Sequence, residues 1–206
     1  SEAIKLLKTK SNAKFAESME VIFFLNIDKA KTDQNLRTVV DLPNGNGRKV
    51  KVAVICGNDK LNEAKSSGAD ISGSEDLINE INSGKVNFDV LISTPDMMAK
   101  VGKLGKVLGP KGLMPNPKLG TVAKDIKSTV DAIKKGRIEI KCDKDGNLGL
   151  SIGKVKFSDK ELTENFKSVY EVVSKEKPVG IKGNFINSIY LSTTMGPSVK
   201  LQLTSL

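Results

Sequence analysis

The hydrophobic pattern of this chain changes type twice, and this double change constrains the fold more than any other feature. Two strand patterns come first, but the first 46 residues are too few to bury a core alone. From Arg48 to Lys135 strand and helix patterns alternate, and after Gly136 antiparallel strand patterns return. We therefore predict an α/β domain, residues 47–136, inserted into a discontinuous antiparallel α+β domain made of residues 1–46 and 137–206.

Local signals predict individual elements within this plan. The segment RKVKVAVICG from Arg48 is apolar on both faces at its centre, as expected for a buried strand of a parallel, Rossmann-like sheet. Thr94 can cap a helix with Pro95 in its first position, and Ser158 with Glu161 forms a capping box. An Asp-Gly turn at 145–146 predicts that RIEIKC and LGLSI pair as a hairpin. Further helices are expected over 1–7, 59–67, 75–82 and 125–135, and strands over 18–26, 35–42, 69–71, 88–93, 184–192 and 198–203.

A stretch rich in proline and glycine, Gly105 to Val122 (GKVLGPKGLMPNPKLGTV), interrupts the alternating pattern. Proline fixes φ and lacks an N–H, so we expect an irregular path here and neither a helix interior nor a central strand. Apolar members such as Leu108 and Leu113 indicate an ordered loop that packs on its own domain. No acidic residue occurs from Met97 to Lys124. A cationic surface loop and a phosphate-facing element both fit, and the residue chemistry alone favours the surface loop.

Composition narrows the class of function. Lysine and arginine number 33 against 24 acidic residues, a net charge of +9, which indicates a polyanionic partner without separating nucleic acid from an anionic membrane surface. No apolar run approaches the length of a bilayer span and no signal-peptide pattern opens the chain, so we expect no membrane role. The chain has no histidine, which excludes His-based triads, acid–base chemistry and zinc sites of the usual type. Cys56 and Cys142 lie far apart in apolar runs and are expected to be buried, inert thiols.

Near the C-terminus, a row of hydroxyl groups lies beside lysines. Alternation along the strand from Phe185 puts four residues on one face, namely Ser188, Tyr190, Ser192 and Thr194. Such rows are common on solvent faces, but next to Lys200, in a segment without acids from 177 to 206, they also suit phosphate and ribose oxygens. The Gly196–Pro197 turn lets backbone groups approach a ligand closely. Met195 fits either the core or a flexible apolar contact.

Three motifs carry a resemblance to a known family: GPKGLMPNPKLGTV from Gly109, AKFAESMEV from Ala13 and STTMGPSVK from Ser192. Together they resemble the ribosomal protein L1 family in its bacterial or organellar form, in the right order and over essentially the whole chain. The resemblance implies the same two-domain, inserted layout. It also suggests a trimmed N-terminus, because family members normally begin with further basic residues. One departure is Gly149, where many members have histidine.

The resemblance implies an RNA-binding, non-enzymatic ribosomal protein without cofactor or metal. Its partners would be the stalk helices of large-subunit rRNA, tRNA leaving the E site and, in bacteria, its own mRNA, which it would repress. It would act as a monomer within the ribosome, in the bacterial cytoplasm or in an organelle matrix or stroma. With the residue chemistry above, it implies RNA contacts at Lys14, Phe15, Glu17, Ser18, Ser188, Thr194, Met195, Gly196, Pro197 and Lys200.

Several alternatives stay open at this point. Phe15 lies outside any regular element, where an aromatic side chain more often packs on a strand than stacks on a base. Glu17 could accept a hydrogen bond from a 2′-hydroxyl or a guanine edge, or hold Lys14 in place. A general nucleic-acid-binding protein outside the ribosome is a second function. A nucleotide-binding enzyme using the α/β insert is a third, although the sequence has neither GxxxxGK[ST] nor GxGxxG after a strand.

Overall fold

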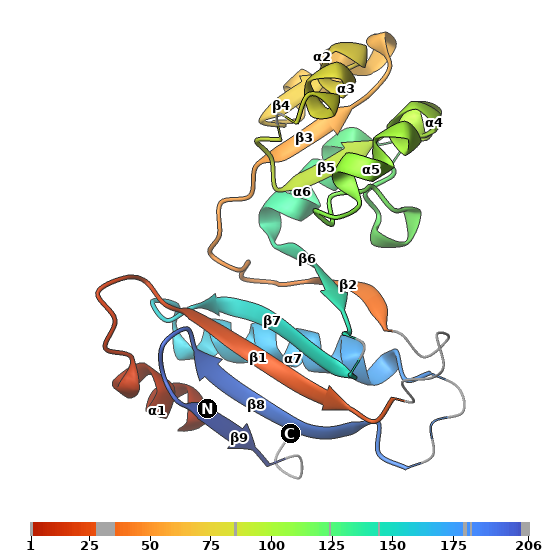
Figure 1. The fold of residues 1–206 in the computed structure, drawn as a ribbon. Helices are drawn as coiled ribbons and strands as arrows, with labels where there is room; N and C mark the ends of the chain where they lie inside the picture. Colours follow the sequence, from red (N-terminus) through yellow and green to blue (C-terminus); the bar gives the residue numbers. More distant parts are fainter. Residues whose placement is uncertain are drawn as a thin grey trace. The chain divides into compact units, whose positions relative to one another are not determined.

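A computed structural model describes residues 2–27, 36–84, 86–123, 125–143, 145–178, 181 and 183–202 (Figure 1). The chain divides into two compact units, which are described separately. Unit 1 consists of Ser1–Gly47 and Lys135–Leu206, and unit 2 of Arg48–Lys134. Asn35 and Leu203, the ends of two predicted strands, lie outside the described residues. Within the described ranges, no helix combines the length and the apolar character that crossing a membrane requires.

A four-stranded antiparallel sheet in the order β7-β1-β8-β9 forms the main layer of unit 1 (Figure 1). Its strands are β1 (Ser18–Leu25), β7 (Asn147–Lys154), β8 (Ile186–Thr193) and β9 (Ser198–Leu201). The sequence SMEVIFFL alternates, so Met19, Val21, Phe23 and Leu25 are buried on one face. The residues between them point to the other face, which we call the open face.

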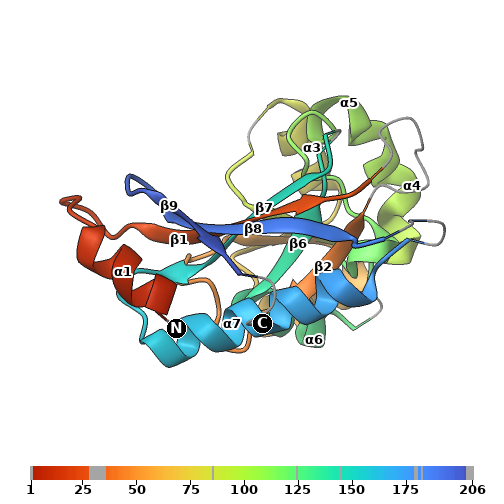
Figure 2. The same cartoon turned by 90° about the horizontal axis from the view of Figure 1, so that it is seen from below.

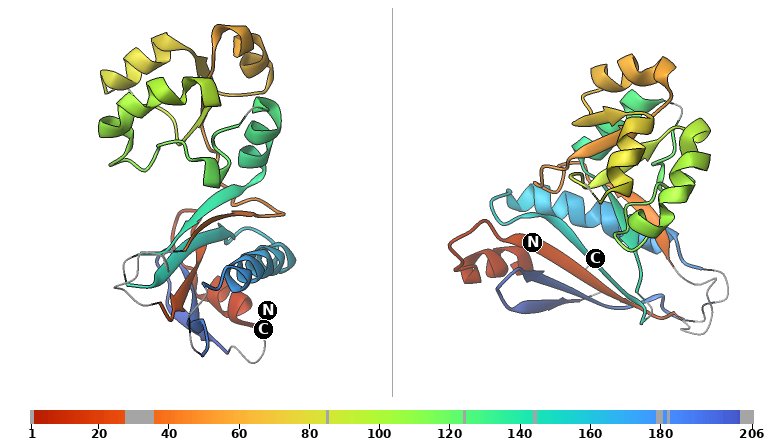
Figure 3. Two further views of the ribbon diagram at one scale, coloured as in Figure 1. Left: turned by 90° about the vertical axis from the view of Figure 1, so that its right-hand side faces the viewer. Right: turned by 45° about the horizontal axis from the view of Figure 1, so that its top comes forward.

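Two helices cover the inner face of this sheet, α1 (Glu2–Lys10) and α7 (Asp159–Lys175). Figures 2 and 3 show both on the same side of the strands. The predicted capping box is confirmed: the Ser158 side chain accepts from the Glu161 N–H, and the Glu161 side chain accepts from the Ser158 N–H. Ile4 and Leu7 of α1 and Phe166 of α7 pack in one core with Phe23. Helix α1 extends three residues beyond the predicted Leu7.

The predicted hairpin around Gly146 is wrong. Strand β6 (Arg137–Lys141) pairs with β2 (Arg37–Asp41) in a separate two-stranded sheet, whereas β7 pairs with β1. The turn itself forms, because the Gly146 N–H donates to the Asp143 carbonyl and the Asp143 N–H to the Asn147 carbonyl. Gly146 then accepts from the Leu25 N–H, so the chain joins β1 at once. Strand β7 buries more apolar surface by pairing with the long, apolar strand β1 than it would by pairing with the shorter, more polar strand β6.

Unit 2 is built on a parallel sheet, as predicted, and the order of its strands is β4-β3-β5. Its central strand β3 (Val52–Ile55) is buried at every position, which explains its unbroken apolar sequence. The other elements are β4 (Ile71–Gly73), β5 (Val90–Ser93), α2 (Leu61–Ser66), α3 (Glu75–Asn82) and α6 (Ile126–Lys135), with short 3-10 turns at Asn58–Lys60 and Pro117–Leu119.

Two expectations for unit 2 need correction. Thr94 takes the N-cap position before Pro95, but its buried hydroxyl makes no hydrogen bond among the described residues. The start of the proline-rich stretch is helical, because α5 (Gly105–Leu108) buries Leu108 before the first proline is reached. It follows two 3-10 turns, Pro95–Met97 and Gly102–Leu104, and α4 (Met98–Val101).

Both cysteines are buried and unpaired, as predicted. Burial raises the pKa of the Cys142 thiol to about 11, and it also raises the pKa of the Cys56 thiol. Both thiols therefore stay protonated and unreactive at neutral pH.

Candidate nucleic-acid interface

The candidate interface is organised around the carboxylate of Glu17, just before β1. Its Oε1 accepts hydrogen bonds from the Ser11 hydroxyl at 2.5 Å and the Ala13 N–H at 3.2 Å, and its Oε2 accepts from the Met195 N–H at 3.1 Å. Glu17 is only 1% exposed. The Ser11 hydrogen bond, followed by the Met195 N–H, lowers the pKa of Glu17 to about 2 against the opposing effect of burial. One charged group thus ties the loop before β1 to the loop after β8.

The same two loops are joined a second time, through Thr194 and Ser18. The Thr194 hydroxyl accepts from the Ser18 N–H at 3.0 Å and lies 3.4 Å from the Ser18 carbonyl, which also accepts from the Thr194 N–H at 3.2 Å. The Ser18 hydroxyl in turn accepts from the Lys154 ammonium group at 2.8 Å. Thr194 therefore has a structural role in addition to any contact with a ligand.

Gly196 closes the loop at a position where a side chain has no room. A Cβ atom there would lie 2.2 Å from the Thr193 hydroxyl oxygen, closer than the 3.0 Å that real Cβ atoms keep. Thr193 itself is buried, and its hydroxyl makes no hydrogen bond within the described part of the chain, although it adds weakly to the lowering of the Glu17 pKa. Glycine is required here for close packing, not for its backbone freedom.

Two large apolar side chains stand out from these fixed loops. Met195 is 75% exposed and Phe15 is 56% exposed, so neither belongs to the core and more than half of each side chain faces solvent. Lys14 and Pro197 are exposed beside them. Exposed apolar side chains that gather on one surface, here on two loops bonded to the same Glu17 carboxylate, are typical of a binding surface.

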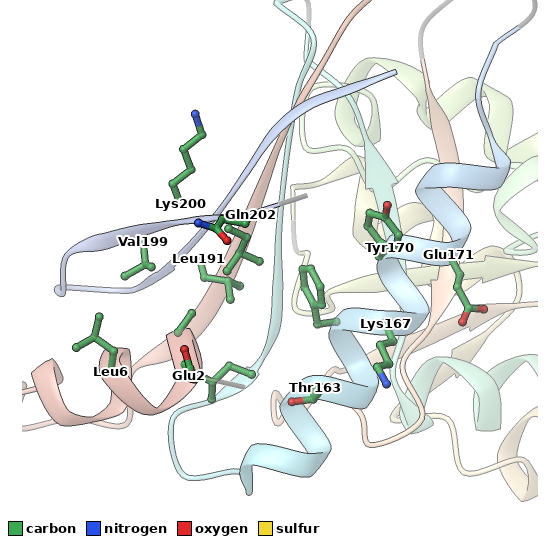
Figure 4. Close-up of a pocket in the computed structure, with 14 residues that line it drawn as sticks. Glu2, Leu6, Thr163, Lys167, Tyr170, Glu171, Leu191, Val199, Lys200 and Gln202 are labelled. Carbon is green, nitrogen blue, oxygen red and sulfur yellow. The ribbon is translucent and has the colours of Figure 1, made fainter. Parts of the chain in front are cut away.

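The open face of the sheet continues this surface. Ser188, Tyr190 and Ser192 alternate with the buried Ile189, Leu191 and Thr193, as the sequence predicts. Lys200 of β9 is the register partner of Tyr190. Figure 4 shows the Lys200 side chain directed to the opposite side of β9 from Val199. The hydroxyl row and Lys200 therefore share one face.

On the inner side, a groove of about 1200 Å³ lies between α1, α7 and β9 (Figure 4). Apolar residues such as Leu6, Val199 and Phe166 line it, together with Lys167 and Glu171. This groove and the open face lie on opposite sides of the sheet.

Sequence reasoning missed two charged residues at the candidate interface. Lys154 reaches it because β7 pairs with β1 in a register that sets Lys154 opposite Ser18. Glu20 lies on the open face between Ser151 and Ser192. Neither has a local signal, since strand pairing alone brings them there. Glu17, by contrast, lies beneath the surface, and it makes no ion pair with Lys14 among the described residues. Groups of three or more His, Cys, Asp or Glu residues suited to a metal ion are absent from the part of the chain that the structure describes.

Comparison with known proteins identifies the family. Residues 6–197 match the Ribosomal protein L1p/L10e family. The chain belongs to the ribosomal protein L1 family. Its curated L1 relatives include the large ribosomal subunit protein uL1 of Prochlorococcus marinus (strain NATL1A), which is 50% identical over 205 residues, covering 100% of this chain and 87% of that protein. The large ribosomal subunit protein uL1 of Rickettsia canadensis (strain McKiel) is 49% identical over 204 residues, covering 99% of this chain and 85% of the relative.

Proposed function

We propose that this protein is a structural constituent of the large ribosomal subunit and binds the stalk-junction region of the large-subunit rRNA. Its membership of the L1 family and the names of its relatives support the ribosomal assignment. The RNA contacts are assigned to unit 1, at the end of the sheet where the loops around Glu17 meet and along the open face.

The observation that carries this proposal is the rigid display of Phe15 and Met195. Both loops are held by the Glu17 carboxylate, and both present an apolar side chain to solvent instead of burying it. Lys14 and Lys154 supply positive charge beside them. Folded RNA is recognised by its shape, its ribose hydroxyls and its unstacked bases, and apolar side chains flanked by hydroxyls and lysines suit all three.

A competition binding assay tests the proposal. A fragment of large-subunit rRNA that contains the stalk junction competes with duplex RNA and duplex DNA at two salt concentrations. We expect strong preference for the junction. Met195→Ala and Phe15→Ala should each weaken junction binding by about tenfold or more, the size expected for contacts that specify a site. The two side chains are exposed, so the fold should tolerate both changes.

Leu6→Ala is the matched control for this assay. Leu6 is another large apolar side chain of unit 1, 49% exposed, but it lies on α1 beside the inner groove. Its substitution should leave junction affinity unchanged. Equal binding to junction, duplex RNA and DNA would refute the proposal in favour of a general nucleic-acid-binding protein.

The finer parts of the function are also proposals. The L1 family assignment supports contact with tRNA leaving the ribosome, repression of the protein's own mRNA in a bacterial setting, and action as a monomer within the ribosome. It further supports a location with the ribosome, in the bacterial cytoplasm or an organelle, and a role without enzymatic activity. A thermal-shift screen with nucleotides tests the absence of enzymatic activity. Stabilisation of the protein by ATP or GTP would count against it, because it would favour a nucleotide-binding enzyme.

A further inference from the structure

The strand register arranges the open face of the sheet in rows that change in character along the strands. The row next to the Glu17 loops is polar and consists of Ser151, Glu20, Ser192 and Ser198. The next row consists of Gly149, Ile22, Tyr190 and Lys200, and the last of Asn147, Phe24 and Ser188. Polar groups therefore give way to the apolar and aromatic side chains of Ile22, Tyr190 and Phe24, about 13 to 20 Å from the Ser18 end of β1 at about 3.3 Å per residue.

Two aromatic side chains lie together in this area. Phe24 and Tyr190 come from β1 and β8, the two central strands, and their rings meet edge to face with centroids 5.5 Å apart. Phe24 is 39% exposed because the side chains of β1 alternate, so that its neighbours Phe23 and Leu25 are buried on the inner face while Phe24 lies on the open face. Within unit 1 both helices lie on the other side of the sheet, so no helix in the described part of this unit covers the aromatic surface (Figure 2).

Gly149 leaves room beside this pair. A Cβ at Gly149 would have only the Ile22 Cγ1 atom within 4 Å, at 3.9 Å. The glycine therefore opens a shallow area over Ile22, bordered by Asn147 and Ser151 on β7. Its backbone φ is not in the left-handed region, so conformation does not explain why a strand keeps glycine here.

We propose that Ile22, Phe24 and Tyr190 form a stacking site for one unpaired nucleotide of the RNA that the Glu17 loops bind, so this inference rests on the proposed function. Unstacked bases bind proteins by stacking on aromatic rings, and in this edge-to-face pair the more exposed Phe24 ring can lie against a base while Tyr190 borders it. Ser188 beside Phe24 and Lys200 beside Tyr190 supply a hydroxyl and a charge for the ribose and phosphate. The stacking site lies on the same open face as the proposed RNA contacts. We therefore propose RNA, and no other partner, as its ligand.

Fluorescence of labelled RNA tests the stacking site. Unpaired adenines of the stalk-junction fragment are replaced one at a time by 2-aminopurine, whose emission reports a change in stacking. With wild-type protein at least one position should change its emission on binding. Phe24→Leu keeps an apolar side chain but removes the ring, and Gly149→Leu covers the open area without removing any contact. Each should abolish that change and weaken affinity about 5- to 100-fold, the range for lost base stacking.

The outcomes separate this inference from the proposed function. If Phe24→Leu and Gly149→Leu keep wild-type affinity and emission while Met195→Ala loses binding, the stacking site is refuted and the proposed function stands. If wild-type protein shows no preference for the junction, both fail together. If Phe24→Leu lowers the melting temperature, Gly149→Leu alone decides whether the stacking site exists. The control Leu6→Ala should change neither affinity nor emission.

Discussion

The packing of Gly196 against Thr193 allows a sharp test of how the candidate interface is built. In Gly196→Ala the new Cβ would lie 2.2 Å from the Thr193 hydroxyl oxygen, 0.8 Å short of the 3.0 Å limit for real Cβ atoms. The loop must move, and overpacking of this kind costs about 1–3 kcal/mol. Movement also disturbs the adjacent Met195 N–H, which donates to Glu17. We expect junction-RNA affinity to fall about 10- to 100-fold, since 1.4 kcal/mol is a factor of ten.

A second substitution at Thr193 should reverse this loss. Thr193→Ala removes the obstructing oxygen, which has no hydrogen-bond partner among the described residues, and Glu17 keeps its hydrogen bonds from Ser11, Ala13 and Met195 when the smaller effect of Thr193 on its pKa is lost. Thr193→Val puts a methyl group in its place and should not rescue. Affinity and melting temperature are measured for the single and double variants as a double-mutant cycle. Gly196→Ala with wild-type affinity, or equal behaviour of Thr193→Ala and Thr193→Val in the double variants, would refute the reasoning.

Three further predictions concern stability and charge. Asn165 is fully buried, accepts from the Asn44 N–H and donates to the Gly45 and Ile152 carbonyls, so Asn165→Ala should lower the free energy of unfolding by about 3 kcal/mol, at about 1 kcal/mol for each bond. Urea denaturation checks this, with Asn44→Ala as a comparison: the Asn44 side chain is only half-buried and donates two hydrogen bonds to α7, so its loss should cost less than that of Asn165. The pKa of Glu17 is lowered from 4.5 to about 2, so its charged form stabilises the fold fully above pH 4.5 and this contribution is lost as pH falls towards 2. Melting temperatures of Glu17→Gln from pH 2 to 7 should show a weaker acid dependence than wild type, and a parallel profile would count against the role of Glu17. Lys154→Met removes one charge at the interface and should reduce the slope of log K against log salt by about one, whereas an unchanged slope would show that Lys154 makes no phosphate contact.

Local signals in the sequence were sufficient for much of the fold. The pattern of SMEVIFFL identified the strand β1, and the spacing of Ser158 and Glu161 identified the start of α7. The unbroken apolar run at Val52–Ile55 identified a central parallel strand. These signals are reliable because each depends on backbone periodicity or on hydrogen bonds between residues a few positions apart.

Strand pairing, by contrast, was decided by the tertiary structure. The Asp-Gly turn predicted that the strands on either side of Gly146 pair with each other, but β7 pairs with β1 and β6 with β2. A turn sequence fixes the local reversal of the chain, while the choice of partner depends on the burial that each distant strand offers.

The sequence by itself determined which residue types are available for a site in this protein: hydroxyls, lysines and a methionine, without any histidine. Only the tertiary structure decided their roles. It buried Glu17 under three hydrogen bonds from the two loops, brought Lys154 to Ser18 across β1 and β7, and set Phe24 against Tyr190 on the open face. These neighbours are up to 178 positions apart in the sequence. Whether a carboxylate faces solvent or accepts from a loop N–H depends on such distant contacts, which no local sequence pattern encodes.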